Sequence, residues 1–156
     1  MRKDSRLSRI LHVLLYLDVA ERPVTSEQLG RMLKTNPVVV RRFMSLLREA
    51  KIVTSVKGHH GGWTLCRVLT DITLLDIHKL LGETSLFTLG LTDSHDGCLV
   101  EKAVNRTVGG VLKEAERLVL KRFSEISINA LAIQFKAGLP DEFHSMMYRD
   151  LSNDAG

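Results

Sequence analysis

Two short basic segments hold the residues of this chain whose types and spacing best fit a chemical task. Arg41 and Arg42 stand side by side after three valines, and residues 57–62 read KGHHGG. Arginine makes paired hydrogen bonds to guanine edges and phosphates, and lysine meets phosphates as a cation. Glycines let a backbone turn tightly and approach a ligand closely. The two segments therefore predict contact with a polyanion, and double-stranded DNA is the natural candidate.

The positive charge of the chain is concentrated in the half that contains these two basic segments. The net formal charge is +4 at pH 7, yet residues 1–70 hold 13 of the 22 Lys and Arg residues and only 5 of the 18 Asp and Glu residues. The second half of the chain is therefore mildly acidic. A solvated basic face is a common alternative explanation, but it does not account for the coincidence of this charge with the two basic segments.

The elements that would position these residues can be read from residues 25–67. Thr25 or Ser26 is predicted to cap a first short helix, with Glu27 or Gln28 in its opening turn. Apolar residues then recur at spacings of three and four, which gives this helix one buried stripe: Leu29, Met32 and Leu33.

A second helix is predicted after a tight turn at residues 34–36. Asn36 can cap it, and Pro37 at its first position loses no needed N–H group. The spacing turns four apolar side chains inward: Val40, Phe43, Met44 and Leu47. Strands at residues 52–56 and 63–67 then flank the KGHHGG tip. This is the pattern of a helix–turn–helix followed by a β-hairpin wing, which places one helix in a DNA major groove.

The pattern defines a set of candidate DNA-binding residues at the start of the first helix, in the turn, on the outer side of the second helix and at the wing tip. They are Ser26, Thr35, Asn36, Val38, Val39, Arg41, Arg42, Ser45, Lys57, His59, His60, Gly61 and Gly62. The two arginines are placed for guanine edges or phosphates, and the wing cations for phosphates or the minor groove. An ordinary helical hairpin with a basic surface is the alternative, because short helix–turn–helix patterns are only moderately specific.

Further helices are predicted on both sides of this unit, at residues 6–20, about 70–82, about 97–124 and 127–135. Thr70 or Asp71 is expected to start the second of these, and Ser127 the last. The fold class is therefore mainly α with a small β-hairpin wing. The expected parts are a winged helix–turn–helix DNA-binding domain at 1–82, a loop at 83–97, a long dimerisation helix with a following short helix at 98–136, and a C-terminal tail at 137–156.

The long helix carries an apolar stripe that so small a domain cannot cover. Its candidate dimerisation residues are Val104, Val108, Val111, Leu112, Ala115, Leu118 and Val119. A second copy of the chain is the natural cover, which predicts a homodimer. Gly109 and Gly110 in the middle of the helix each cost about 1 kcal/mol relative to alanine. They indicate either a kink or a close contact between helices.

The composition argues against several classes of protein. Hydrophobic residues make up 44% of the chain and charged residues 26%, which is ordinary for a globular protein. No apolar run is long enough to span a bilayer, and the basic first residues lead into an amphipathic stretch rather than a signal peptide, so we expect a cytoplasmic protein. The chain shows no catalytic triad, phosphate loop, zinc-protease motif or paired catalytic carboxylates, so we do not expect an enzyme.

The chain resembles the Rrf2 family of bacterial winged-helix repressors, of the IscR, NsrR and CymR type. The resemblance rests on SEQLGRML, NPVVVRRFMSLLREAKIVTSVKG with GGWTL, DITLLDIHKLLG and GCLVEKAV, in the family's order. It covers the chain to about residue 135, and NPVVVRR is most similar to the branch without an iron–sulfur cluster, the YwnA-like proteins. The resemblance implies a repressor whose long helices cross in a homodimer, with two winged domains on a palindromic operator.

The cysteines decide whether this chain could hold the iron–sulfur cluster that some members of the family bind. Cluster-binding members carry three cysteines before the long helix, and here only Cys98 matches, while the other two positions hold Leu86 and Thr92. Because a cluster needs mostly sulfur ligands, we expect none, and no other cofactor. Cys66, in the second wing strand, is predicted to be structural.

Cys98 has two readings, which the sequence leaves open. It is either a small packing residue or a redox thiol activated at a helix N-terminus, where His95 could assist. A metal site can also be drawn, but acidic residues at a helix start are more often caps, so it carries little weight. Its residues would be Asp93, His95, Asp96, Cys98 and Glu101.

These observations favour a sequence-specific DNA-binding transcriptional regulator that acts as a homodimer, with redox sensing through Cys98 as one form of control. Two alternatives remain. One is a regulator controlled by a metabolic enzyme that docks on the acidic second half. The other is a protein-interaction module with weak DNA binding.

Overall fold

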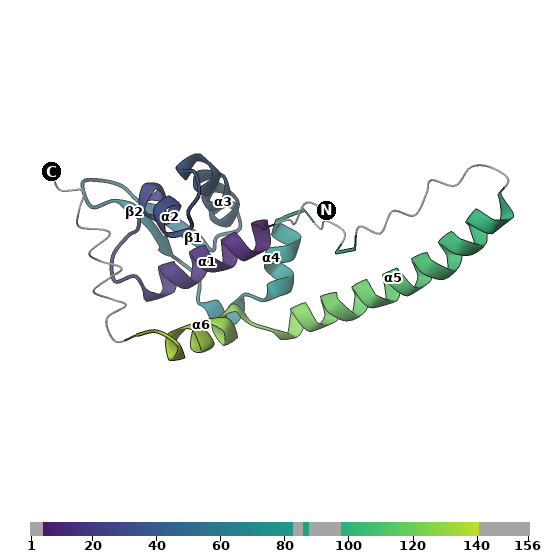
Figure 1. Cartoon of the computed structure of the whole chain (residues 1–156). Helices are drawn as coiled ribbons and strands as arrows, with labels where there is room; N and C mark the ends of the chain where they lie inside the picture. The colour runs from purple at the N-terminus through teal and green to yellow at the C-terminus, as the bar shows by residue number, and fades with distance from the viewer. Residues whose placement is uncertain (1–4, 83–85, 88–97, 141–156) are drawn as a thin grey trace.

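The computed structural model describes residues 5–82, 86–87 and 98–140. In chain order the elements are α1 (Arg6–Val19), α2 (Ser26–Met32), α3 (Pro37–Glu49), β1 (Val53–Val56), β2 (Gly62–Leu65), a 3-10 turn η1 (Leu69–Asp71), α4 (Leu74–Leu80), α5 (Leu99–Glu125) and α6 (Ile128–Ala137). Figure 1 shows these elements gathered around α1, except for α5, which projects away from the rest. The expected fold class, mainly α with a two-stranded hairpin, is confirmed.

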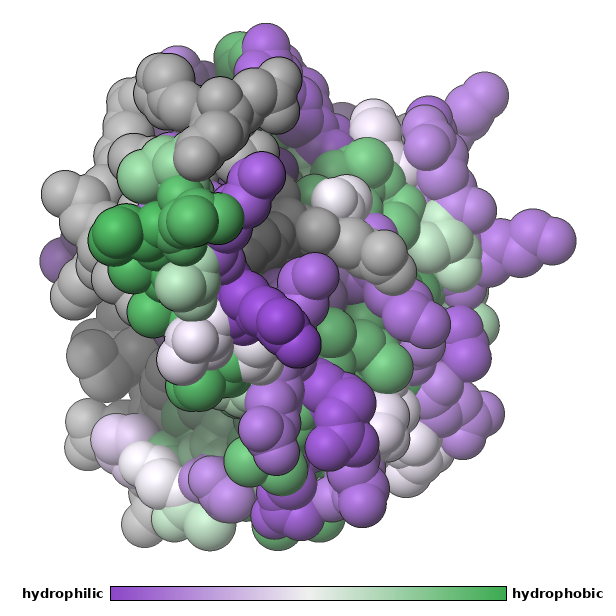
Figure 2. All heavy atoms as spheres, turned by 90° about the vertical axis from the view of Figure 1, so that its right-hand side faces the viewer, coloured by the Kyte–Doolittle hydropathy of each residue, from purple (hydrophilic) through white to green (hydrophobic). Residues whose placement is uncertain are grey.

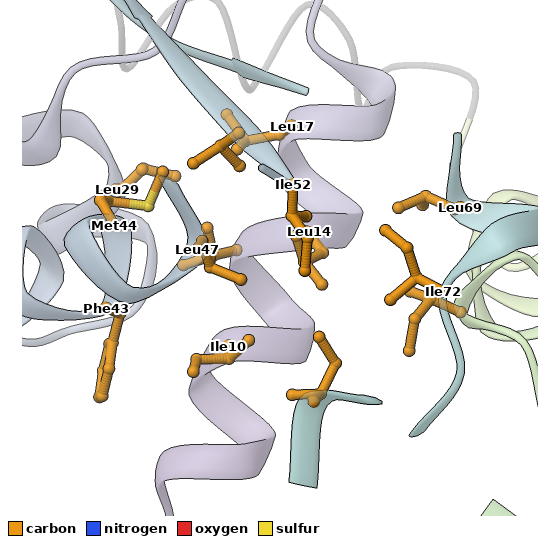
Figure 3. Packing of buried hydrophobic residues seen from close by; sticks show 14 of the residues in the cluster. Ile10, Leu14, Leu17, Leu29, Phe43, Met44, Leu47, Ile52, Leu69 and Ile72 are labelled. Carbon is orange, nitrogen blue, oxygen red and sulfur yellow. The ribbon is translucent and has the colours of Figure 1, made fainter. Parts of the chain in front are cut away.

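The core is built on α1, which lies between two groups of apolar side chains. Ile10, Leu14 and Leu17 line its buried face. Figure 3 shows these residues with the helix–turn–helix side chains on one side and those of η1 and the segment after it on the other. The flanking residues shown are Leu29, Phe43, Met44, Leu47, Ile52, Leu69 and Ile72. Full burial of each such side chain contributes about 1.5–3 kcal/mol.

The start signals of α2 and α3 act as the sequence predicts. Thr25 caps α2 in a reciprocal box: its hydroxyl accepts from the Gln28 backbone N–H at 3.2 Å, and the Gln28 side chain accepts from the Thr25 N–H at 2.8 Å. Asn36 caps α3 by accepting from the Val38 N–H at 2.8 Å, with Pro37 at the first helical position. These caps satisfy backbone donors that have no partner inside the helices.

The start of α4 differs from the prediction. The cap is Thr73 rather than Thr70 or Asp71, and Leu69–Asp71 forms a separate 3-10 turn. Thr73 and Asp76 make a reciprocal capping box, with the Thr73 N–H donating to the Asp76 carboxylate at 2.8 Å. Neither earlier candidate has such a partner three residues ahead, because Thr73 and Leu74 occupy those positions. The helix α4 contacts both α1 and α5.

The long helix α5 is continuous over 27 residues, so it extends about 40 Å. It passes through Gly109 and Gly110 without a break in the helix. None of its residues is buried, and several apolar side chains are exposed. Figure 2 views the molecule from the side toward which α5 projects and shows hydrophobic surface among hydrophilic side chains. Among the described helices, none combines the length and apolarity needed to cross a membrane.

After α5 the chain returns to the core. The Leu74 N–H donates to the Ile126 carbonyl at 3.0 Å, and the Ile128 N–H donates to the Ile72 carbonyl at 2.8 Å. Ser127 caps α6, as predicted, and Ile128 is fully buried against the core. The short helix therefore packs on the N-terminal unit, on α1 and η1, rather than extending α5.

The Thr73–Asp76 box makes the stability of the protein depend on pH. The Thr73 backbone N–H holds the pKa of the Asp76 carboxyl below its ordinary value. A carboxyl with a lowered folded-state pKa contributes stability that is present above its unfolded pKa, about 3.9, and lost as the pH falls through the folded value. We expect Asp76→Asn to lower the free energy of unfolding at neutral pH and the difference from wild type to shrink near pH 3. Urea titrations at both pH values check this.

Thr73→Ala should cost about 1 kcal/mol in the same titrations, because it removes the cap itself. Asp71→Asn is the control, since Asp71 lies outside the helix cap. An Asp76→Asn penalty that stays constant with pH would contradict the assignment.

Candidate nucleic-acid interface

The outer face of α3 brings four of the predicted residues together. Val38 is 51% exposed, Arg41 and Arg42 are exposed, and Ser45 is half-buried. With Leu46 they line a shallow hollow of about 450 Å³ along the exposed side of the helix. The opposite side of α3 is buried in the core, which fixes the rotation of the helix and so the direction of this face. Val39 is half-buried at its edge.

Arg41 does not stand alone on this face. Its guanidinium forms an ion pair with the carboxylate of Glu27, in the first turn of α2, and both side chains are about half exposed, at 57% and 52%. The carboxylate orients Arg41 and neutralises part of its charge. Sequence reasoning placed Glu27 only in the opening turn of a helix. Only the tertiary structure shows that Glu27 faces Arg41, because the two residues lie on different helices.

The turn between the helices carries a second contact that the sequence did not reveal. Arg9 of α1 donates to the Thr35 hydroxyl at 3.4 Å, which brings a cation beside the turn. Thr35 is half-buried and its N–H donates to the Gly30 carbonyl at 2.8 Å. Asn36 is exposed, and its side-chain oxygen is engaged in capping α3. The turn that holds the candidate DNA-binding residues Thr35 and Asn36 is thus ordered by hydrogen bonds within the chain.

The wing is attached to the helix–turn–helix through Ser26 and Trp63. Ser26 is only 6% exposed, and its hydroxyl accepts from the Trp63 indole N–H at 3.1 Å. Trp63 and Val24 also exchange two backbone hydrogen bonds, of 2.8 and 3.1 Å. Of the predicted DNA-binding residues, Ser26 therefore lies beneath the surface, where it positions the wing.

The wing itself is a short antiparallel hairpin with an exposed basic tip. Its strands, Val53–Val56 and Gly62–Leu65, are shorter than predicted and pair Val53 with Leu65 and Val56 with Gly62. Lys57, His59 and His60 are exposed, with the two imidazole rings 5.0 Å apart.

Two of the tip glycines are required by close backbone approach. A Cβ at Gly61 would lie 2.5 Å from the Val56 carbonyl oxygen, and one at Gly62 would lie 2.8 Å from the backbone of Val24. Both distances are shorter than a carbon–oxygen or carbon–carbon contact allows. The sequence Gly61-Gly62 is therefore what permits the hairpin to close against the strand-like segment before α2.

Both cysteines are free thiols on exposed residues. Cys98 is exposed at the N-cap of α5, so it is not the buried packing residue that one reading predicted. Cys66 is also exposed, just after β2, and its thiol donates to the Lys51 carbonyl at 3.4 Å. This hydrogen bond is the contact that supports the structural role predicted for Cys66. The metal site considered in the sequence analysis includes Asp93, His95 and Asp96, and these three residues lie outside the described residues.

Comparison with known proteins agrees with this geometry. The sequence model of the Rrf2 family, described as "Iron-dependent Transcriptional regulator", matches residues 4–134. A Bacillus subtilis protein, the candidate HTH-type transcriptional regulator YwnA, is 28% identical over 125 residues, which cover 80% of this chain and 92% of that protein.

Two solved structures share the fold. A candidate transcriptional regulator from Lactobacillus plantarum matches with a TM-score of 0.71 and 21% identity, over 95% of this chain and 99% of that chain. CymR, the global cysteine regulator of B. subtilis, matches with a TM-score of 0.62 and 18% identity, over 86% and 98%.

The residues present do not fit the iron–sulfur cluster that some members of such a family hold. The chain has two cysteines, and one of them is in the wing. Leu86 occupies one of the positions at which a second thiolate would be needed. Within the described ranges, no group of three or more His, Cys, Asp and Glu side chains gathers in a way that could hold a metal ion. The donor set therefore lacks the sulfur that a cluster requires.

The Ser26–Trp63 hydrogen bond can be tested directly, because Trp63 is the only tryptophan in the chain. We expect Ser26→Ala to lower the free energy of unfolding by about 1 kcal/mol, since the indole N–H loses its protein partner. The tryptophan emission should also shift to longer wavelength as water replaces the hydroxyl. Ser45→Ala, on the outer face of α3, is the matched control. If emission and stability both match wild type, the hydrogen bond does not hold the wing.

Proposed function

The chain belongs to the Rrf2 family of transcriptional regulators, and on that premise we propose that it binds a palindromic DNA operator as a homodimer through α3 and the wing. The observation that carries the proposal is the exposed face of α3, with Arg41 and Arg42 directed away from a core that fixes the helix. Repression, by occupancy of the operator, is the mode that we propose.

The proposed readout divides between base edges and backbone. Val38 and Arg41 lie in the first two turns of α3, the part of a recognition helix that reaches the bases in helix–turn–helix proteins, and Ser45 follows in the third turn. Arg41 would exchange its Glu27 partner for a guanine edge. Because a carboxylate disfavours the approach of a phosphate, the pair would favour a specific base contact over random contact with the backbone.

The wing and the turn would supply contacts that do not depend on sequence. Lys57, His59 and His60 at the tip would meet phosphates or the minor groove, and Arg9 beside the turn would meet a phosphate on the other flank. The backbone contacts between Val24 and Trp63 would hold the wing in a fixed relation to α3. The two sets of contacts would therefore set the position of the recognition helix along the duplex.

The proposed homodimer rests on the stripe of α5. Val104, Val108, Val111, Ala115 and Leu118 alternate at spacings of four and three, so at about 100° per residue they fall within about 80° of the helix circumference. Val111 is 63% exposed and Leu118 60% in the single chain. Leu112 and Val119 are half-buried beside the stripe. A second copy of α5 matches such a stripe in length and in character, because it carries the same one.

Mutation of the DNA-facing cations should separate base readout from backbone contact. We expect Arg41→Ala to reduce discrimination between operator and scrambled DNA by roughly 1–3 kcal/mol. Lys57→Ala should weaken both alike and change the salt slope by about one unit. Titrations on both DNAs at several salt concentrations measure these effects, with Arg106→Ala on α5 as the control for lost charge. Unchanged discrimination in Arg41→Ala would show that the α3 face is assigned wrongly.

The α5 stripe predicts the oligomeric state. We expect the wild-type protein to sediment as a dimer, and the pair of changes Val108→Asp and Val111→Asp to give monomers of 17.5 kDa. Two charges buried without partners should weaken association by about 3 kcal/mol or more. Lys113→Asp changes charge on the opposite side of α5 and should leave the dimer intact. A dimer that survives both stripe changes would require a different interface.

Redox control through Cys98 is the finer part of the proposal, supported by exposure of its thiol at the N-cap of α5. We expect mild oxidation with hydrogen peroxide to change operator affinity in the wild type and not in Cys98→Ser. Cys66→Ser should behave as wild type. The opposite result would place any redox response in the wing.

A further inference from the structure

A groove between α4 and α5 has the size of a small-molecule site. It encloses about 520 Å³ between Leu75–Lys79 on α4 and residues 116–124 of α5. Pockets for small ligands in proteins span about 300–1,000 Å³. Figure 1 shows α4 beside the end of α5 that joins the rest of the molecule. The groove therefore lies at the junction of the winged unit and the projecting helix.

Three cations line the groove: Lys79 from α4, with Arg117 and Lys121 from α5. All three side chains belong to exposed residues. Among its described lining residues, one carboxylate opposes them, that of Glu116, and it already accepts from the Leu86 backbone N–H at 3.1 Å. The acidic second half of the chain thus contains a local excess of positive charge, directed at a concave surface.

A buried histidine completes the polar lining. His78 is 7% exposed and lies edge to face with Phe123, with the ring centroids 6.2 Å apart. A ring N–H of His78 can donate a hydrogen bond to an oxygen of a molecule bound in the groove. Leu75 and Leu120 supply apolar surface beside it.

The groove stays open in the proposed dimer. At about 100° per residue, Leu120 and Arg117 lie about 160° and 140° around α5 from the centre of the stripe, and Lys121 lies about 100° away, at its flank. Pairing of two stripes would therefore leave the part of the groove formed by Arg117 and Leu120 facing away from the partner helix.

We propose that this groove binds a small organic anion, whose carboxylate or phosphate meets Arg117, Lys121 and His78 while its apolar part lies on Leu75 and Leu120. An anion bound there would bridge α4 and α5, so it would bias the angle between the winged unit and the long helix. Its action as an effector of DNA binding rests on the proposed function, whereas binding of the anion does not.

Titration of the full-length protein with two probes, citrate and inorganic phosphate, tests the site in the absence of DNA. At constant ionic strength we expect saturable binding of at least one probe, with one site per chain by calorimetry, and a shift of the His78 imidazole resonances in NMR spectra. The probe that binds more tightly identifies the headgroup. Saturation by neither probe would overturn the proposal.

Two arginine variants distinguish a built site from general charge. Arg117→Gln should weaken binding at least tenfold, and Arg106→Gln, on the same side of α5 but about 16 Å away, should not change it. Equal weakening by both would show that the probes sense only the charge of the helix, which would also overturn the proposal.

Operator titrations with and without the bound probe then test the effect on DNA. Loss of DNA binding in every condition would contradict the proposed function while leaving the anion site in place. Anion binding with unchanged operator affinity would show that the site is not regulatory.

Discussion

Burial of one face of α1 is the interaction on which the rest of this structure depends. Ile10, Leu14 and Leu17 contact the helix–turn–helix on one side and η1 with its neighbours on the other. Since each fully buried apolar side chain contributes about 1.5–3 kcal/mol, this one helix joins both halves of the core. The rotation of α3, and so the direction of Arg41, follows from the same packing. A shift of α6 or η1 against α1 would be transmitted to the recognition face through close-packed side chains.

The candidate interface is ordered largely by residues outside the recognition helix. Ser26 and Val24 hold the wing through Trp63, Glu27 holds Arg41, and Arg9 contacts the turn. Groups held in place before binding lose less conformational freedom when a ligand arrives, so more of the contact energy appears as affinity. An ion pair at the surface is worth about 0–1 kcal/mol, so Glu27 can release Arg41 at little cost. In the proposed complex Glu27 would therefore act on the choice of DNA more than on the stability of the fold.

The sequence predicted what short-range rules determine and missed what distant residues determine. The caps Asn36 and Ser127 were predicted correctly, and Thr25 was one of two candidates, because a cap bonds to a backbone within three residues. The start of α4 was placed too early, because Thr70, Asp71 and Thr73 are all capping residues and only the Asp76 partner selects among them. The partners of Ser26 and Arg41 are set by tertiary packing. No local pattern shows that Trp63, 37 positions along the chain from Ser26, supplies its hydrogen bond. The groove between α4 and α5 was not predicted from the sequence for the same reason, because its cations come from two separate helices.

The two backbone hydrogen bonds at the end of α5, between Leu74 and Ile126 and between Ile72 and Ile128, make that end a pivot. The winged unit is fastened there, and the helix beyond it is a lever arm about 40 Å long. A tilt of about 5° at the pivot displaces the opposite end of such an arm by about 3.5 Å, close to the rise of one base pair. In the proposed dimer, a change in the angle between the winged unit and α5 would change how the two α3 helices are placed relative to each other. A small change of inclination at this joint would therefore alter the fit of the proposed dimer to its operator.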